Sequence, residues 1–226
     1  MSPSFPTTKA SKIAIDELYR QLHELQTTNA AALGLVDVFH TYVGPSYHSN
    51  ESNVRLMMVG KATAEWKVKG TSPEVNQSDK FIEKEIIPGK YHSAFWFFMK
   101  SLALALHNHP DLENDKEIYR SVAWSNVMRI GEGGYNPGRT VAALQRKACL
   151  ELLKSEVDLY APTHLVFVTG STYWRDLEQL FPVNWTEHAT DYWRAKYGET
   201  QIFWTRHPQG WEKTRRDEVI DLIAHA

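Results

Sequence analysis

The chain has 226 residues and a mass of 26.0 kDa; 42% of its residues are hydrophobic and 23% are charged. This length and apolar content fit one domain with a sizeable core and exclude wholesale disorder, which requires a chain poor in apolar residues. The net charge of −2 argues against a protein that coats nucleic acid through charge alone, because such proteins are distinctly basic.

Cysteine content and hydropathy exclude further classes of protein. Cys149 is the single cysteine, which excludes a disulfide framework and any site built from several thiolates, such as an iron–sulfur cluster. No apolar run approaches the roughly 20 residues that cross a bilayer, and residues 1–12 lack the apolar stretch of a signal peptide. We therefore expect a soluble, cytoplasmic protein with no membrane partner.

The chain is expected to begin with a tail and a helix. Residues 1–10 predict a disordered tail, and residues 11–226 predict a single α/β domain. Ile15, Leu18, Leu22 and Leu25 recur at helical spacing, which predicts an amphipathic helix over residues 11–33. Residues 42–53 contain Gly, Pro, Ser and Asn and predict a loop.

Four short apolar runs then alternate with helical patterns. The runs, at 54–59, 121–127, 165–168 and 201–205, are typical of strands buried on both faces. The helical patterns cover 93–107, 141–160, 171–180 and 211–225. This alternation predicts an α/β fold, a three-layer α/β/α sandwich around a central four-stranded parallel sheet. Cys149 falls in the apolar stripe of the 141–160 helix, which favours a buried small residue over a nucleophile.

Ligands of open parallel sheets bind beyond the carboxyl ends of the strands, so the residues that follow each strand are the candidate site. Gly60 ends the first strand and lets the backbone turn and approach a ligand. Lys61 or Glu65 can then reach a substrate. The alternative is a plain turn between strand and helix; a phosphate loop is excluded because its glycine spacing is absent.

The second candidate segment follows the 121–127 strand. Asn126 carries both a donor and an acceptor, so it can read the edge of a base, or it can simply cap the next turn. The glycine-rich residues 131–138 predict a mobile loop, beside which Arg129 and Arg139 are solvated or contact phosphate.

The third candidate segment follows the 201–205 strand. Arg206 and His207 come first, and Pro208 restricts the backbone so that the imidazole is held in place. Basic residues occupy the first turns of the last helix: Lys213, Arg215 and Arg216. The alternative is a capped helix with a solvated basic face. His107 and His109 fit an ordinary polar loop better than a metal site, so no metal is expected.

Taken in order, these segments resemble the uracil-DNA glycosylase superfamily. The matching features are a strand that ends in Val59-Gly60-Lys61-Ala62, an aromatic helix beginning at residues 92–96, and Ser125-Asn126-Val127 with a downstream Asn-Pro-Gly-Arg at 136–139. Residues 162–170 and the terminal His207-Pro208 complete the set. Residues 125–170 resemble the iron–sulfur branch and residues 92–102 the mismatch-specific branch. The resemblance spans roughly residues 54–224.

The resemblance implies hydrolysis of the N-glycosidic bond of a damaged, uracil or deaminated, base that is flipped out of DNA. His207 matches the histidine that stabilises the departing base, and Asn126 matches the asparagine that reads its edge. Gly60, Ala62 and Tyr91 would complete the base pocket, with Tyr91 stacking on the base. Arg129, Arg139, Arg206, Lys213, Arg215 and Arg216 would hold phosphates.

The sequence departs from the family at some positions. Lys61 stands where the family commonly has an acid or asparagine that positions water, and Glu65 is the nearest carboxylate. Only one of the four cysteines of the iron–sulfur branch is present, so no cluster and no other cofactor is expected.

Three functions stay open: a glycosylase acting on single- or double-stranded DNA, a non-catalytic protein of the same fold that binds a nucleobase, nucleotide or nucleic acid, and an α/β hydrolase of another small molecule. A monomer is expected.

Overall fold

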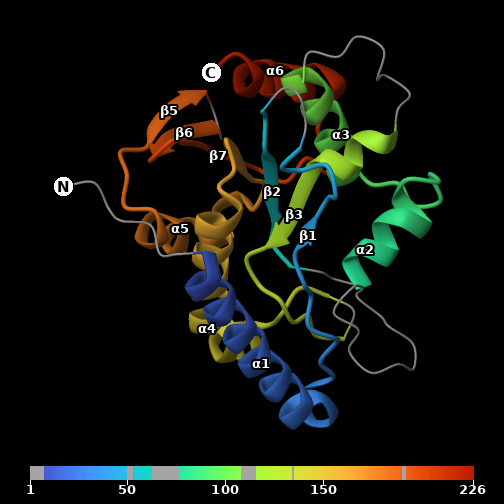
Figure 1. The fold of residues 1–226 in the computed structure, drawn as a ribbon, viewed down its shortest axis with the longest axis vertical. Helices are drawn as coiled ribbons and strands as arrows, with labels where there is room; N and C mark the ends of the chain where they lie inside the picture. The colour runs from blue at the N-terminus through green and yellow to red at the C-terminus, as the bar shows by residue number, and fades with distance from the viewer. Residues whose placement is uncertain (1–7, 50–52, 63–76, 108–115, 134, 190–191) are drawn as a thin grey trace. The chain divides into compact units, whose positions relative to one another are not determined.

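The computed structural model describes residues 8–49, 53–62, 77–107, 116–133, 135–189 and 192–226 (Figure 1). The chain forms two compact units. The described residues of the first unit are 8–40, 61–62, 126–133 and 135–161, and those of the second are 41–49, 53–60, 77–107, 116–125, 162–189 and 192–226. The single domain over residues 11–226 stays a prediction. Helix α1 begins at Thr8, inside the predicted tail of residues 1–10, and residues 1–7 lie outside the described part.

Seven strands are found within the described residues, and they form one mixed sheet. They are β1 (Tyr42–Val43), β2 (Leu56–Gly60), β3 (Val122–Asn126), β4 (His164–Phe167), β5 (Thr186–Ala189), β6 (Tyr192–Tyr197) and β7 (Thr200–Thr205), in the order β1-β3-β2-β4-β7-β6-β5. β2, β4 and β7 are parallel neighbours. β1 is antiparallel to β3, and β6 is antiparallel to both of its neighbours, β5 and β7. All of the sheet lies in the second unit except Asn126, the last residue of β3, which belongs to the first.

The α/β class is confirmed, but the prediction of a four-stranded, all-parallel sheet was wrong. The four predicted runs correspond to β2, β3, β4 and β7, and every residue of β2 and β3 is buried, as their continuous apolar sequences indicate. The sheet also contains β1, β5 and β6. β1 is too short to leave a pattern, and it lies in the predicted loop over 42–53. β6 mixes buried and exposed residues, so it lacks the apolar run of a central strand.

The helices match most of the predicted patterns. Predicted helices correspond to α1 (Thr8–Leu33), α3 (Ala94–His107), α4 (Arg139–Tyr160), α5 (Trp174–Leu180) and α6 (Lys213–Ala224). The 3₁₀ turn η4 (Gly170–Tyr173) precedes α5, and η3 (Lys116–Ser121) precedes β3. Helix α2 (Gln77–Phe81), with the π-helical turn η1 (Ile82–Ile86), was not predicted. No helix in the described ranges is long and apolar enough to cross a membrane.

Helices α1 and α4, both in the first unit, lie side by side (Figure 1, blue and gold). Three residues of the predicted stripe of α1 are buried, since Ile15, Leu18 and Leu22 are at most 8% exposed, and the fourth, Leu25, is half-buried. On α4, Cys149 is buried, as predicted, together with Leu152 and Leu153, but Leu144, which the same apolar stripe was predicted to include, is 49% exposed. The first unit is therefore built on an apolar seam between two long helices.

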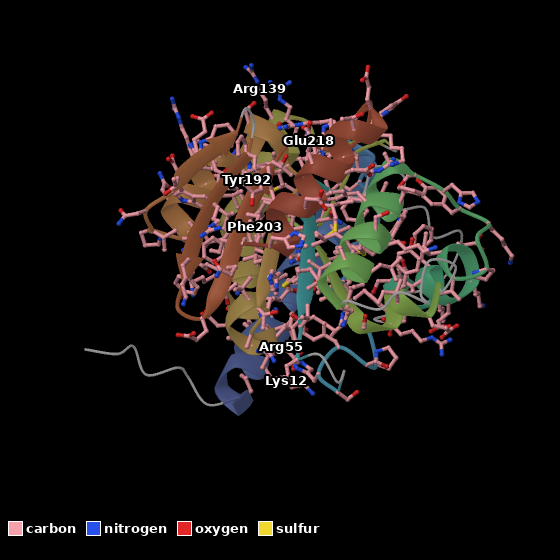
Figure 2. The ribbon with its side chains drawn as sticks, turned by 90° about the horizontal axis from the view of Figure 1, so that it is seen from above. Lys12, Arg55, Arg139, Tyr192, Phe203 and Glu218 are labelled. Atoms are coloured by element: carbon pink, nitrogen blue, oxygen red, sulfur yellow. The ribbon has the colours of Figure 1, made fainter. Side chains whose placement is uncertain are left out.

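In the second unit, α3 packs against α6, and α6 in turn contacts the antiparallel part of the sheet. Figure 2 shows Tyr192 of β6 next to Phe203 of β7, their ring centroids 6.2 Å apart, with Glu218 on α6. The Tyr192 hydroxyl donates a hydrogen bond to the Leu222 carbonyl at 3.3 Å. Added strands β5 and β6 thus extend the parallel sheet and share its helical cover.

Candidate functional site

The carboxyl ends of β2, β4 and β7 form one edge of the sheet in the second unit, because these strands are parallel neighbours. The amide of Val168 donates to the Val59 carbonyl at 3.0 Å, and the Trp204 indole donates to Thr169 Oγ1 at 3.2 Å and to the Gly170 carbonyl at 3.1 Å. Gly60, predicted to approach a ligand, is the buried last residue of β2. The three predicted site segments that follow β2, β4 and β7 therefore begin at the same end of the sheet.

His207 follows β7 by two residues, and its ring is held on two sides. Its Nδ1 accepts a hydrogen bond from the backbone N–H of Gln209 at 3.2 Å. The imidazole stacks on Phe95 of α3, with centroids 6.3 Å apart and planes 21° apart. Because Nδ1 is an acceptor, the neutral ring carries its proton on Nε2. The half-buried imidazole therefore presents an Nε2–H donor in a fixed orientation.

A continuous cluster of aromatic rings connects the surroundings of His207 to Tyr91 within the second unit. Phe95 contacts Trp96 and Trp124, and Phe81 contacts Trp96, Trp124 and Tyr91. Tyr91 lies at the end of this cluster, edge-on to Phe81 at 5.4 Å, and is 47% exposed. The predicted stacking residue is thus an accessible ring supported from behind by other rings.

Asn126 closes β3 and is only 2% exposed. Its side-chain nitrogen is fully buried and has no hydrogen-bond partner among the described residues. Buried amide nitrogens in folded proteins are almost always paired, because an unpaired buried donor costs about 1–3 kcal/mol. This donor is therefore available to an acceptor on a ligand.

Lys61 and Ala62, both half-buried, lie beside the segment that follows Asn126. The Met128 amide donates to the Lys61 carbonyl at 2.9 Å, and both residues belong to the first unit. Two of the predicted site segments are thus adjacent. Glu65 lies outside the described residues.

Gln145 of α4 fixes the backbone after Asn126, a role that the sequence analysis missed. Its Oε1 accepts from the amides of Arg129 and Ile130, both at 2.9 Å, and from the Cys149 thiol at 3.2 Å. Its Nε2 donates to the Ile130 carbonyl at 2.7 Å. A glutamine inside the apolar stripe of a helix is the signal that could have revealed this contact.

The prediction that Arg129 is solvated or contacts phosphate was wrong. Its side chain is completely buried, and one guanidinium nitrogen donates to Glu156 Oε2 at 2.5 Å. Burial is the largest single effect and lowers the pKa of this guanidinium, but Glu156, Tyr19 and Cys149 together outweigh it and raise the pKa above its usual value. Tyr19 donates to the other oxygen of Glu156 at 2.8 Å. Arg129 is a structural cation, because buried charges need partners and this one has them.

The other predicted phosphate-binding cations lie at the surface or close to it. Arg139, the first residue of α4, is exposed and labelled in Figure 2; Arg206 is exposed as well. On α6, each cation has an acid of the same helix within reach: Lys213 pairs with Asp217, Arg215 with Glu218 at 3.5 Å, and Arg216 with Asp217 at 3.8 Å. The helix carries three basic and three acidic residues, so it offers no net positive charge.

The predicted site residues divide between the two units. The first unit carries Lys61, Ala62, Asn126, Arg129 and Arg139, and the second carries Gly60, Tyr91, Arg206, His207, Lys213, Arg215 and Arg216. Across the part of the chain that the structure describes, no group of three or more His, Cys, Asp or Glu side chains is arranged to hold a metal ion. No protein-family model matches the chain, and no curated protein matches it in sequence.

Proposed function

We propose that the chain is a glycosylase-like hydrolase that removes a damaged base from DNA, with the α/β/α sandwich of the uracil-DNA glycosylase superfamily. The observation that carries this proposal is the buried amide of Asn126, whose nitrogen has no partner in the described residues. An unpaired donor at a strand end suits the carbonyl oxygen of an oxidised or deaminated base edge. The ordered set of segments at the strand ends supports the same family.

In this proposal, the C1′–N bond breaks with its electron pair leaving on the base. The oxygen of a water molecule bonds to C1′, and the proton that this water loses ends on the base. Negative charge develops on an oxygen of the departing base, and the Nε2–H of His207 donates a hydrogen bond to it. Because Gln209 holds Nδ1 as an acceptor, the ring needs no reorientation as the charge develops. Tyr91, which lies in the same unit as His207, stacks on the base.

The test is base release from oligonucleotides that carry uracil, hypoxanthine or xanthine, single- and double-stranded, read as abasic sites. We expect release from at least one of them. Substitution His207→Leu removes the Nε2 donor and should lower the rate by about 10²–10³-fold, the usual effect of losing one such donor. His225→Leu is the matched control, since His225 is exposed just beyond α6 and bonds only locally to Asp221.

No abasic site with any substrate, under conditions where a known glycosylase works, would remove the catalytic proposal. An equal loss of rate in His207→Leu and His225→Leu would remove the role of His207.

The second candidate is a non-catalytic protein that binds a nucleobase, nucleotide or nucleic acid. It is favoured by Lys61, which stands where the family positions water with an acid or amide, and by the acid partners of the α6 cations. Calorimetry with free bases and oligonucleotides separates the two candidates: binding without base release selects this one. A monomer, a cytoplasmic location and the absence of a cofactor stay predictions.

A further inference from the structure

Two histidines of the first unit face each other through the same ring atom. His23 lies on α1 and His40 follows the segment 35–39, and their Nε2 atoms are 2.8 Å apart. His40 stacks on Tyr19 of α1 with centroids 4.0 Å apart and planes 9° apart. Their contact joins α1 to the end of this segment, and neither ring has a role in the proposed function.

The short distance between the two Nε2 atoms limits how many protons they can hold. At 2.8 Å one nitrogen donates its N–H and the other accepts on a bare lone pair. One added proton can be accommodated on Nδ1 of the donating ring. The accepting ring already carries its single proton on Nδ1, so a second added proton must go to its Nε2, which places two N–H groups head to head. The two rings must then separate.

The charged and titratable groups around the pair decide when this happens. Burial, then His23 and the buried Arg129, lower the pKa of His40 to about 4. Burial also lowers the pKa of His23, partly offset by Asp37. The Tyr19 hydroxyl donates to Glu156, whose other oxygen accepts from Arg129. The closed pair is therefore neutral at neutral pH, and acid opposes it.

The segment that ends at His40 is bonded to the residues that follow Asn126. The Phe39 amide donates to the Arg129 carbonyl at 2.8 Å, and the Val36 amide donates to the Gly131 carbonyl at 3.2 Å. Movement of His40 away from α1 therefore pulls on backbone that also carries the strand-end segment of the candidate site.

We propose that His23 and His40 form a proton-controlled latch: the pair is closed while one Nε2 proton is shared, and acidification opens it and loosens residues 36–40 from residues 129–131. This inference concerns the first unit alone and holds whether or not the chain is a glycosylase.

The test is hydrogen exchange of the Phe39 and Val36 amides in the full chain, measured by NMR at about pH 7.5 and about pH 3.5, below the pKa of His40, and corrected for intrinsic exchange. We expect the corrected rate to rise by at least about tenfold on acidification, the factor that one pKa unit represents. His23→Gln keeps a donor opposite His40 but cannot take up a proton, so the rise should disappear. His225→Gln, at an exposed histidine of the second unit, should leave the rise intact.

The protonation state of the rings gives a second measurement that needs no variant. Long-range proton–nitrogen spectra should show one protonated and one bare Nε2 in the pair at about pH 7.5, and two protonated Nε2 atoms at about pH 3.5, below the pKa of His40. Two protonated or two bare Nε2 atoms at neutral pH would overturn the latch. So would an unchanged exchange rate in the wild-type chain, or an equal rise in His23→Gln.

Discussion

Gln145 and Asn126 are two buried side-chain amides of the first unit, and they differ in the number of hydrogen-bond partners that they have. Gln145 makes four bonds, three of them to backbone groups of Arg129 and Ile130. The nitrogen of Asn126 has no partner among the described residues. One amide holds the segment in place, and the other is held ready for a ligand.

This difference predicts opposite costs for the same kind of substitution. Gln145→Leu strands two backbone N–H groups and one carbonyl in the interior, and should lower the free energy of unfolding by about 3 kcal/mol or more, because each unpaired buried group costs about 1–3 kcal/mol. Asn126→Leu removes a donor that is already unpaired and should cost less than about 1 kcal/mol. Urea unfolding of both variants measures this. A larger loss in Asn126→Leu than in Gln145→Leu would show that the Asn126 nitrogen has a partner in the folded chain.

The Arg129–Glu156 pair gives a second prediction at this scale. Arg129→Met leaves the fully buried Glu156 carboxylate without its cation, which should cost about 3–5 kcal/mol. Adding Glu156→Gln should recover a large part of this loss. Lys213→Met is the control, because the Lys213–Asp217 pair is exposed and should be worth at most about 1 kcal/mol. Similar losses at the two pairs, in denaturant unfolding, would contradict the structural role of Arg129.

At the scale of elements, Ala161 and Gly170 both adopt a left-handed backbone conformation, but only the second is the residue type that adopts it without strain. Ala161, which caps the C-terminus of α4, has a φ of 45° and a ψ of 59°, a left-handed conformation that an L side chain resists. Gly170, just after β4, has a φ of 58°, and a Cβ added there would meet no atom within 4 Å. Glycine at position 161 would relieve backbone strain. At position 170, glycine is favoured by the positive φ alone, because a side chain would have room there.

Ala161→Gly should therefore raise the free energy of unfolding by about 0.5–1 kcal/mol, the relief of strain less the extra freedom of glycine in the unfolded chain. Gly170→Ala should lower the free energy of unfolding by about 1 kcal/mol. Thermal or urea unfolding measures both. Shifts of the same sign in the two variants would contradict this account.

The helices and strands that could be predicted from the sequence are those whose pattern of apolar residues lies within the element itself. β2 was predictable because all of its residues are buried on both faces, and α1 because its apolar residues repeat on one side. β1 and β6 were not, since β1 has two residues and β6 owes its place to pairing with β7 rather than to an apolar run. Likewise, the sequence placed Asn126 and His207 directly after strands, which requires only the strand ends.

Partners distant in sequence explain what was missed. The burial of Arg129 depends on Glu156, 27 residues away, and on Tyr19, 110 residues away. Neither pairing follows from spacing or composition, so an arginine in a polar loop was read as solvated. Gly44 is a similar case: a Cβ there would lie 2.1 Å from the Arg120 carbonyl oxygen, a close approach that no local pattern reveals.

For the whole molecule, three half-buried histidines make the stability depend on pH. The pKa values of His23, His40 and His164 are all lowered, chiefly by burial, that of His40 to about 4. The unfolded chain therefore binds more protons than the folded chain between about pH 4 and pH 6.5, and stability falls as the pH falls through this range. Asp79, whose pKa is raised by burial and Glu83, acts in the opposite direction but is a single group.

The thermal midpoint should thus decrease on acidification from about pH 7 to about pH 4.5, with each histidine contributing up to about 1.4 kcal/mol per pH unit. Calorimetry across this range checks it. The double variant His40→Gln/His164→Gln should flatten the profile, while His225→Gln should not. A midpoint that rises with acid would contradict the sign.

The two outermost strands of the sheet also affect whether copies of the chain can associate through their strands. One margin of the sheet is the two-residue β1, and the other is the four-residue β5, whose register against β6 shifts between Glu187 and Ala189. A strand from a neighbouring molecule needs a long, regular row of free backbone groups on which to align, and short or irregular margins supply none. Growth of fibrils by strand addition is thereby discouraged, even though the interior of the sheet is rich in the β-branched and aromatic residues on which such growth depends.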